Sequence, residues 1–189
     1  MSRKLALVLP GGGYTPLGPV IHFPVLALEQ LGYEVRAVSY PDFPLSVDPF
    51  PWDDFSALTT HATRAAVGEE PWEDTVVVAK SLGTGILARV GDRLGLPRPR
   101  AIWLTPLFWD EAVRKGAATL GWPSLLVAGS ADSHHDPDGF DAVSKALTAQ
   151  SLLIEGADHG LEFPGDIRST VEAMSDLVEA TLAFASDEA

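Results

Sequence analysis

Three residues far apart in the chain, Ser81, Asp132 and His159, have side chains that together could perform nucleophilic catalysis. A serine hydroxyl is a poor nucleophile at neutral pH and needs a base, and a histidine base needs a carboxylate to fix its tautomer and stabilise its cation. Each of the three follows a short apolar run typical of a buried strand. We therefore expect them to meet at one edge of a parallel sheet.

The segment 75–91, TVVVAKSLGTGILARVG, predicts how Ser81 is presented. A buried strand over 75–79 is followed almost at once by an apolar helix, which forces the turning residue into a strained conformation and requires small neighbours two positions away. Those neighbours are Ala79 and Gly83. The motif departs from G-x-S-x-G because Ala79 occupies the first glycine position, and Ser81 as an ordinary helix-capping serine is the alternative interpretation.

The elements around these residues form a regular alternation of apolar runs and helix-like segments. Continuous apolar runs indicate strands covered on both faces, so the pattern predicts an α/β fold with a doubly wound, mostly parallel six-stranded sheet and helices on both faces. Ligands of such sheets bind beyond the carboxyl ends of the strands. The predicted strands are Lys4–Leu9 and residues 34–39, 75–79, 101–104, 124–128 and 151–154.

Helices are expected over residues 20–31, over about 53–67 with Asp53 or Asp54 as the cap, and within 164–184. In the last segment, apolar residues at helical spacing predict one face packed on the sheet. These are Ile167, Val171, Met174, Val178 and Leu182.

Three consecutive glycines follow the first predicted strand, in the segment 10–14, PGGGY. A dinucleotide-binding G-x-G-x-x-G fails because Pro16 occupies the last glycine position, and no lysine follows to make a phosphate loop. Two interpretations stay open for this segment: a flexible turn, or a loop whose N–H groups bind an oxyanion.

Composition excludes several classes of function. The 189 residues fit one domain, spanning 1–189, and 13 basic against 26 acidic residues give a net charge of −13, which disfavours nucleic acid and anionic membranes as partners. Cysteine is absent, which excludes disulfides and thiolate chemistry. The first apolar run is too short for a signal peptide or a membrane span, so we expect a soluble, cytoplasmic protein without membrane insertion, present as a monomer or homodimer.

Aromatic residues follow two of the predicted strands. The segment 40–52 either forms a wall of the pocket or packs the top of the domain. After the fourth strand, Leu107, Phe108 and Trp109 are candidates for a substrate pocket together with Tyr14, although Trp103, Phe108 and Trp109 are equally well explained as core and rim aromatics.

Taken together, the segments 10–14, 79–83, 129–132 and 156–160 resemble those of a compact α/β-hydrolase, similar to small dienelactone-hydrolase-like serine esterases. The resemblance covers essentially the whole chain, but we expect the two amino-terminal antiparallel strands of the full fold to be missing, and no cap domain fits. It implies Ser81 as the nucleophile, His159 as the general base and acid, and Asp132 as the orienting acid. It also implies an oxyanion hole formed by the N–H of Leu82 with that of Gly12 or Gly13.

Other titratable residues offer alternatives to this assignment. Asp136 or Asp138 could replace Asp132 as the acid, and with His134 and His135 they suggest a metal loop. We expect no metal and no cofactor, because adjacent histidines rarely reach one ion and the glutamate of a calcium loop is lacking; the two histidines are expected at the rim.

Three further basic side chains are expected to lie outside the chemistry. His22 and His61 fall on predicted helices and are expected to be structural. Lys80 precedes Ser81 and is expected to point away from the site, to the surface or the sheet edge.

The sequence thus predicts a serine hydrolase of the carboxylesterase or thioesterase type acting on a small-molecule acyl substrate through an acyl-enzyme. Two alternatives are a binding or regulatory protein that keeps the fold without turnover, and a cofactor-free haloperoxidase or perhydrolase that uses the same triad.

Overall fold

The structure is a computed structural model, and it describes residues 3–40 and 50–186. Six strands and six α-helices alternate along the chain, with a 3-10 turn, Gly91–Arg93, after the third helix. The strands are β1 (Lys4–Leu9), β2 (Tyr33–Ala37), β3 (Asp74–Lys80), β4 (Pro99–Leu104), β5 (Ser124–Gly129) and β6 (Gln150–Ile154). The helices are α1 (Pro19–Gln30), α2 (Trp52–Val67), α3 (Leu82–Val90), α4 (Glu111–Leu120), α5 (Pro137–Leu147) and α6 (Ile167–Ser186).

The strands form one sheet in the order β2-β1-β3-β4-β5-β6, and every neighbouring pair is parallel. The predicted doubly wound fold is confirmed, and the sheet is parallel throughout. From β1 the chain first moves outward to β2 and then returns to β3 on the other side, so β1 and β3 flank the topological switch point. Sheets of this kind bind ligands outside the carboxyl ends of the strands at that point.

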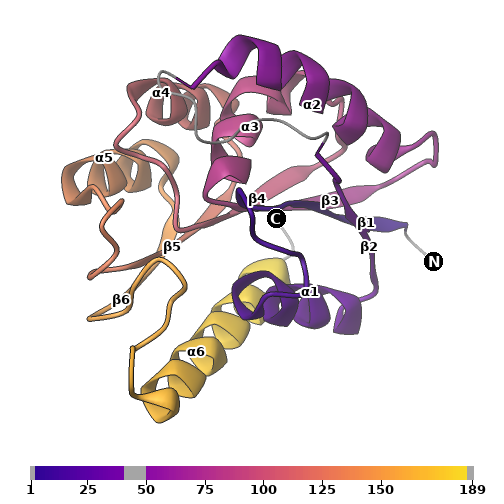
Figure 1. The fold of residues 1–189 in the computed structure, drawn as a ribbon. Helices are drawn as coiled ribbons and strands as arrows, with labels where there is room; N and C mark the ends of the chain where they lie inside the picture. The colour runs from indigo at the N-terminus through magenta and orange to yellow at the C-terminus, as the bar shows by residue number, and fades with distance from the viewer. Residues whose placement is uncertain (1–2, 41–49, 187–189) are drawn as a thin grey trace.

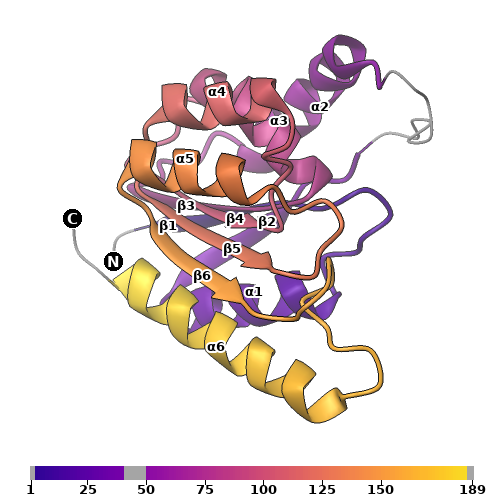
Figure 2. The same ribbon diagram turned by 90° about the vertical axis from the view of Figure 1, so that its left-hand side faces the viewer.

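Helices cover both faces of the sheet, as Figures 1 and 2 show: α2, α3, α4 and α5 on one side, and α1 with α6 on the other. The core is correspondingly divided into two clusters that use alternate residues of the same strands. In β3, for example, Val77 and Ala79 belong to the cluster under α2 to α5, whereas Val76 and Val78 face α1 and α6. Burial on both faces explains why the strands are continuously apolar.

Two helix predictions need correction. Helix α2 begins at Trp52 after Pro51, and no side chain caps it; Asp53 and Asp54 instead lie in its first turn, where their charge favours the helix dipole. In α6 the predicted stripe is wrong at its start, because Ile167 and Val171 are exposed. The buried face is formed by Ala173, Met174, Leu177, Thr181, Phe184 and Ala185.

Within the described part of the chain, none of the helices is long and apolar enough to cross a membrane.

Candidate active site

Ser81 lies at the turn between β3 and α3 in a backbone conformation that side-chain-bearing residues rarely adopt, with φ 47° and ψ −112°. It occupies the N-cap position of α3, but its side chain makes no capping hydrogen bond. The capping explanation therefore does not account for this serine. A strained residue at the carboxyl end of a strand and the start of a helix is the geometry of a nucleophile elbow.

Neighbouring groups hold the strained turn in place. The Ser81 N–H donates to the Leu104 carbonyl at 3.0 Å, which ties the elbow to the end of β4. The Thr84 hydroxyl donates to the Ser81 carbonyl at 2.6 Å and accepts from the Leu107 N–H at 3.2 Å. Thr84 thus links the elbow to the loop after β4, a role that no pattern in the sequence indicated.

Gly83 allows the elbow to approach β1 closely. A Cβ atom at this position would lie 2.0 Å from the Leu9 carbonyl oxygen and 2.9 Å from that of Pro10. The small residue expected two positions after Ser81 is therefore required by backbone contact. Ala79, two positions before Ser81, is fully buried, and its register partners are Leu9 and Trp103.

The glycine loop after β1 lies beside the elbow. A Cβ placed on Gly11 would be 3.5 Å from the Ser81 Cβ. The Tyr14 N–H donates to the Gly11 carbonyl at 3.2 Å, closing a turn in which Gly12 and Gly13 are the central, exposed residues, and Gly13 has φ 65°.

Two further groups define this side of the site. Leu82 is the first residue of α3, so helix geometry gives its N–H no intrahelical partner. The Tyr40 hydroxyl donates to the Pro10 carbonyl at 3.0 Å and anchors the start of the glycine loop. Tyr40 is the first residue of the segment 40–52, which was predicted to form a pocket wall or to pack the top of the domain. Residues 41–49 of that segment lie outside the described residues.

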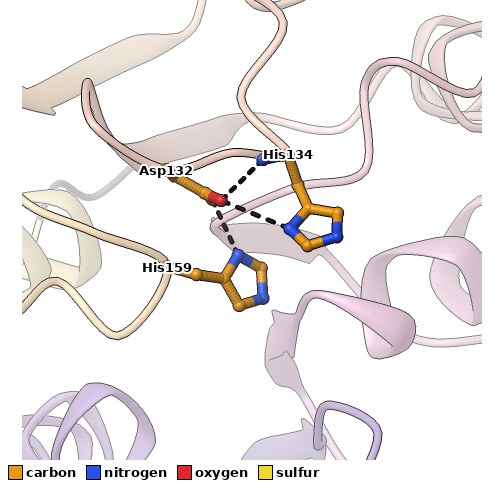
Figure 3. Close-up of side chains that lie close together, drawn as sticks. All are labelled: Asp132, His134 and His159. Carbon is orange, nitrogen blue, oxygen red and sulfur yellow. Dashed lines mark hydrogen bonds and ion pairs between the residues drawn. The ribbon is translucent and has the colours of Figure 1, made fainter.

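Asp132 and His159 form a close hydrogen-bonded pair, shown in Figure 3. The His159 Nδ1 atom is 2.7 Å from the Asp132 Oδ2 atom, and the Asp132 side chain is almost completely buried. Burial alone would raise the pKa of the Asp132 carboxyl, but the hydrogen bonds from His159 and from the His134 N–H outweigh it, so the pKa lies below its ordinary value. Asp132 is therefore ionised at neutral pH, as an orienting carboxylate must be.

The loops that bear Asp132 and His159 are fastened to each other. The Ala131 N–H donates to the Ala157 carbonyl at 3.0 Å, and the Gly156 N–H donates to the Ser130 hydroxyl at 2.8 Å. At the end of β5, a Cβ on Gly129 would lie 2.2 Å from the Ala157 carbonyl oxygen. This close backbone approach sets the distance between the carboxylate and the imidazole.

The His159 loop is also braced internally. Asp158 accepts hydrogen bonds at its Oδ1 atom from the N–H groups of Gly160, at 2.7 Å, and Glu162, at 3.0 Å. Its own N–H donates to the Glu162 carbonyl at 3.0 Å. The residue directly before His159 thus fixes the conformation of the loop.

Lys80 connects this loop to the elbow, and here the sequence prediction was wrong. The side chain is buried, with 2% of its surface exposed, because the His159 loop covers the end of β3. Its Nζ atom donates to the Thr105 hydroxyl and to the His159 carbonyl, both at 3.3 Å, and lies 4.5 Å from the centre of the Tyr14 ring. Burial lowers the pKa of Lys80 to about 8, against the opposing effect of the Asp132 and Asp158 carboxylates.

The Lys80 contact places the backbone of His159 next to the residue that precedes Ser81. Between the Ser81 hydroxyl and the His159 ring themselves, both within the described chain, the structure contains no hydrogen bond. Catalytic hydrogen bonds of unliganded enzymes are often long and tighten only when substrate binds. Asp132 and His159 are therefore joined by a direct hydrogen bond, whereas Ser81 is linked to them through its neighbour Lys80, which donates to the His159 carbonyl.

The predicted pocket residues have different surroundings. Phe108 is 1% exposed and packs between Trp103 and Phe140, so it is a core residue. Leu107 is also buried, whereas Trp109 is exposed. Tyr14 is half-buried, and its hydroxyl accepts from the Val20 N–H at 3.2 Å.

The alternative acids are engaged elsewhere. Asp136 pairs with Arg114 at 3.3 Å at the start of α5, and Asp138 is exposed in the first turn of that helix. His22 lies on α1 and His61 is exposed on α2.

His134 differs from the other histidines outside the pair. Its Nδ1 atom is 3.5 Å from the Asp132 Oδ1 atom, and its N–H donates to the same oxygen at 2.8 Å. One possible ligand atom from each of Asp132, His134 and His159 lies within 4.8 Å of the other two, a grouping that could hold a metal ion.

Sequence comparison gives no relatives: no protein-family model matches the chain, and no curated protein sequence matches it. Solved structures do match over nearly the whole chain. An α/β serine hydrolase without a lid, XC6422 from Xanthomonas campestris, aligns with a TM-score of 0.66 at 17% identity, covering 100% of this chain and 86% of its own. The chain has the α/β-hydrolase fold.

Two other solved structures align with nearly the whole chain. Est1E from Butyrivibrio proteoclasticus, solved with bound ferulic acid, aligns with a TM-score of 0.73 at 12% identity, covering 98% of this chain and 91% of its own. A bromoperoxidase from Bacillus anthracis aligns with a TM-score of 0.65 at 15% identity, covering 99% and 93%. At these identities the likeness shows the α/β-hydrolase fold and no particular substrate.

Proposed function

We propose that this protein is a serine hydrolase that cleaves a carboxylic ester or thioester through an acyl-enzyme on Ser81. The observation that carries the proposal is the 2.7 Å hydrogen bond between His159 and a buried Asp132. It lies at the same sheet edge as Ser81, whose backbone is strained and whose hydroxyl makes no capping hydrogen bond to α3. A carboxylate fixed to Nδ1 leaves Nε2 of the imidazole as the basic atom.

In the first half of the proposed reaction, the Ser81 Oγ atom attacks the substrate carbonyl carbon while its proton passes to His159 Nε2. The resulting oxyanion accepts hydrogen bonds from the N–H of Leu82 and from that of Gly12 or Gly13. The carbon–oxygen or carbon–sulfur bond then breaks, and His159 returns the proton to the departing alcohol or thiol. Asp132 stabilises the transient imidazolium without taking its proton.

In the second half, His159 accepts a proton from a water molecule that attacks the acyl-enzyme. The Ser81–acyl bond breaks, Ser81 regains a proton, and the carboxylic acid leaves. The exposed glycine turn favours small or extended acyl groups as substrates, and the described residues add no lid domain to the six strands and their helices.

The test uses p-nitrophenyl acetate turnover and covalent labelling by a fluorophosphonate probe, with the labelled peptide identified by mass spectrometry. Wild-type protein should hydrolyse the ester and carry the label on Ser81, and Ser81→Ala should lose both while its circular dichroism spectrum stays unchanged. Ser133→Ala is the matched control, because Ser133 is exposed near the site and its hydroxyl lies 3.4 Å from His134 Nδ1. Labelling that persists in Ser81→Ala would remove Ser81 as the nucleophile.

A second candidate is favoured by the bromoperoxidase neighbour. The same Ser81 acyl-enzyme attacked by hydrogen peroxide in place of water would yield a peracid. A peroxide-dependent halogenation assay in acetate buffer separates this perhydrolase from a hydrolase. The absence of a burst with any ester, thioester or lactone, including ferulate esters, together with no peroxide-dependent activity, would favour the alternative of a non-catalytic binding protein.

A further inference from the structure

His134 is not used by the proposed reaction, although it lies against the catalytic pair. Figure 3 shows its ring beside that of His159, with both Nδ1 atoms directed at the Asp132 carboxylate. The ring centres are 5.1 Å apart. The arrangement puts two imidazole nitrogens and one carboxylate oxygen around a common point, all within 4.8 Å of one another.

We propose that Asp132, His134 and His159 form a site for a divalent transition metal ion of the Zn²⁺ type, and that the bound ion switches off the hydrolase. Two neutral imidazoles and a carboxylate match the ligand preference of zinc, whereas calcium and magnesium prefer oxygen ligands. Three protein ligands would leave one position for water.

The distances require only small movements. Ligands around a tetrahedral zinc at about 2.0–2.2 Å are roughly 3.3–3.5 Å apart. The His134 Nδ1 atom is already 3.5 Å from the Asp132 Oδ1 atom, whereas the His159 Nδ1 atom is held at 2.7 Å by the other oxygen, Oδ2, in a hydrogen bond that would have to open. One ligand atom from each residue lies within 4.8 Å of the other two, so these atoms must move closer to reach the zinc spacing. His134 has 55% of its side chain exposed and can move inward after giving up its 3.4 Å contact with Ser133.

The charge around the site also favours a cation. Among the described residues, the buried Asp132 carboxylate forms ion pairs with the two histidines, and the net charge of −13 attracts cations in general. The Lys80 ammonium, which interacts electrostatically with Asp132, acts against a bound cation.

Metal binding would inhibit through the tautomer of His159. In the proposed resting state, Nδ1 holds the proton that is donated to Asp132, and Nε2 has the free lone pair. A metal ion bound to Nδ1 uses the lone pair of that nitrogen, so Nδ1 can no longer hold the proton. The single proton of the neutral ring therefore moves to Nε2. His159 can then no longer accept the Ser81 proton. This inhibition depends on the proposed hydrolase function, whereas the binding itself does not.

Binding is tested by isothermal titration of ZnCl₂ into tag-free protein, for the wild type, His134→Ala and His135→Ala. His135 is the matched control, since it is the adjacent histidine but packs on Phe140. Loss of even an outer partner of a metal site typically costs about 10-fold to 100-fold in affinity, so His134→Ala should bind at least about tenfold more weakly. His135→Ala should bind like the wild type. No zinc binding by the wild type, or equal binding by His134→Ala, would overturn the site.

Inhibition is tested on p-nitrophenyl acetate hydrolysis in the same three proteins. Zinc should inhibit the wild type and His135→Ala at concentrations matching the titration, with recovery on adding EDTA, and His134→Ala should require at least about tenfold more zinc. Full activity of zinc-saturated wild type would overturn the inhibitory role. If metal-free protein shows no hydrolysis, the hydrolase proposal fails, and the titration alone still decides whether the site exists.

Discussion

Replacing Lys80 by methionine should change how the stability of this protein depends on pH. Burial lowers the pKa of Lys80 from its ordinary 10.5 to about 8 in the folded protein. This difference corresponds to about 3 kcal/mol that disfavours the charged lysine in the fold. Methionine has a similar length and no charge, so its burial carries no such free-energy cost.

The sign follows from proton binding. Between pH 8 and 10.5 the unfolded chain holds the Lys80 proton and the folded protein has released it, so stability rises with pH there. The destabilisation is fully present below the folded pKa and disappears above the unfolded one. For folded and unfolded pKa values of about 8 and 10.5, the wild type should recover about 1 kcal/mol of stability relative to Lys80→Met between pH 7 and pH 9.

The groups that face Lys80 do not produce this change themselves. The Asp132 carboxyl, whose pKa lies below its ordinary value, stays ionised throughout this range, and burial raises the pKa of the Tyr14 hydroxyl. Because the wild type and the variant share all other lysines and tyrosines, the contributions of these residues to the pH dependence of stability cancel in the comparison.

The assay is urea denaturation at several pH values from 7 to 9.5, followed by circular dichroism. Lys115→Met is the control, because Lys115 is exposed and, among the described residues, forms an ion pair with Glu111 on the same helix; its difference from wild type is the baseline for the comparison. A Lys80→Met difference that is constant across the range would refute the reasoning. The same variant should hydrolyse p-nitrophenyl acetate more slowly, since the His159 carbonyl loses its 3.3 Å anchor.

Two further substitutions test the site. Gly83→Ala should destabilise the fold by about 1–3 kcal/mol, measured by thermal denaturation, because its Cβ would lie 2.0 Å from the Leu9 carbonyl oxygen; an unchanged melting temperature would contradict the close approach. Asp132→Asn should lower kcat on p-nitrophenyl acetate by on the order of 10³ to 10⁴, because the amide cannot hold the His159 tautomer. Asp136→Asn is its control and should keep near-normal kcat; equal losses in both variants would argue against Asp132 as the orienting acid.

The sequence by itself determined the sheet and the edge at which the candidate residues meet. Continuous apolar runs specify strands buried on both faces, and parallel strands end at a common edge. That rule is local, so it placed Ser81 after β3, Asp132 after β5 and His159 after β6 without any knowledge of contacts. The small residues Ala79 and Gly83, two positions on either side of Ser81 in the sequence, likewise predicted the elbow.

Only the tertiary structure decided what covers each residue. Lys80 is buried because a loop 79 residues further along the chain lies over it, and nothing near Lys80 in the sequence specifies that contact. The only local signal was its position as a charge at the end of a continuously apolar strand. Phe108 is a core residue, and Ile167 and Val171 of α6 are exposed, for the same reason. Which face of an element is buried depends on which distant element packs against it.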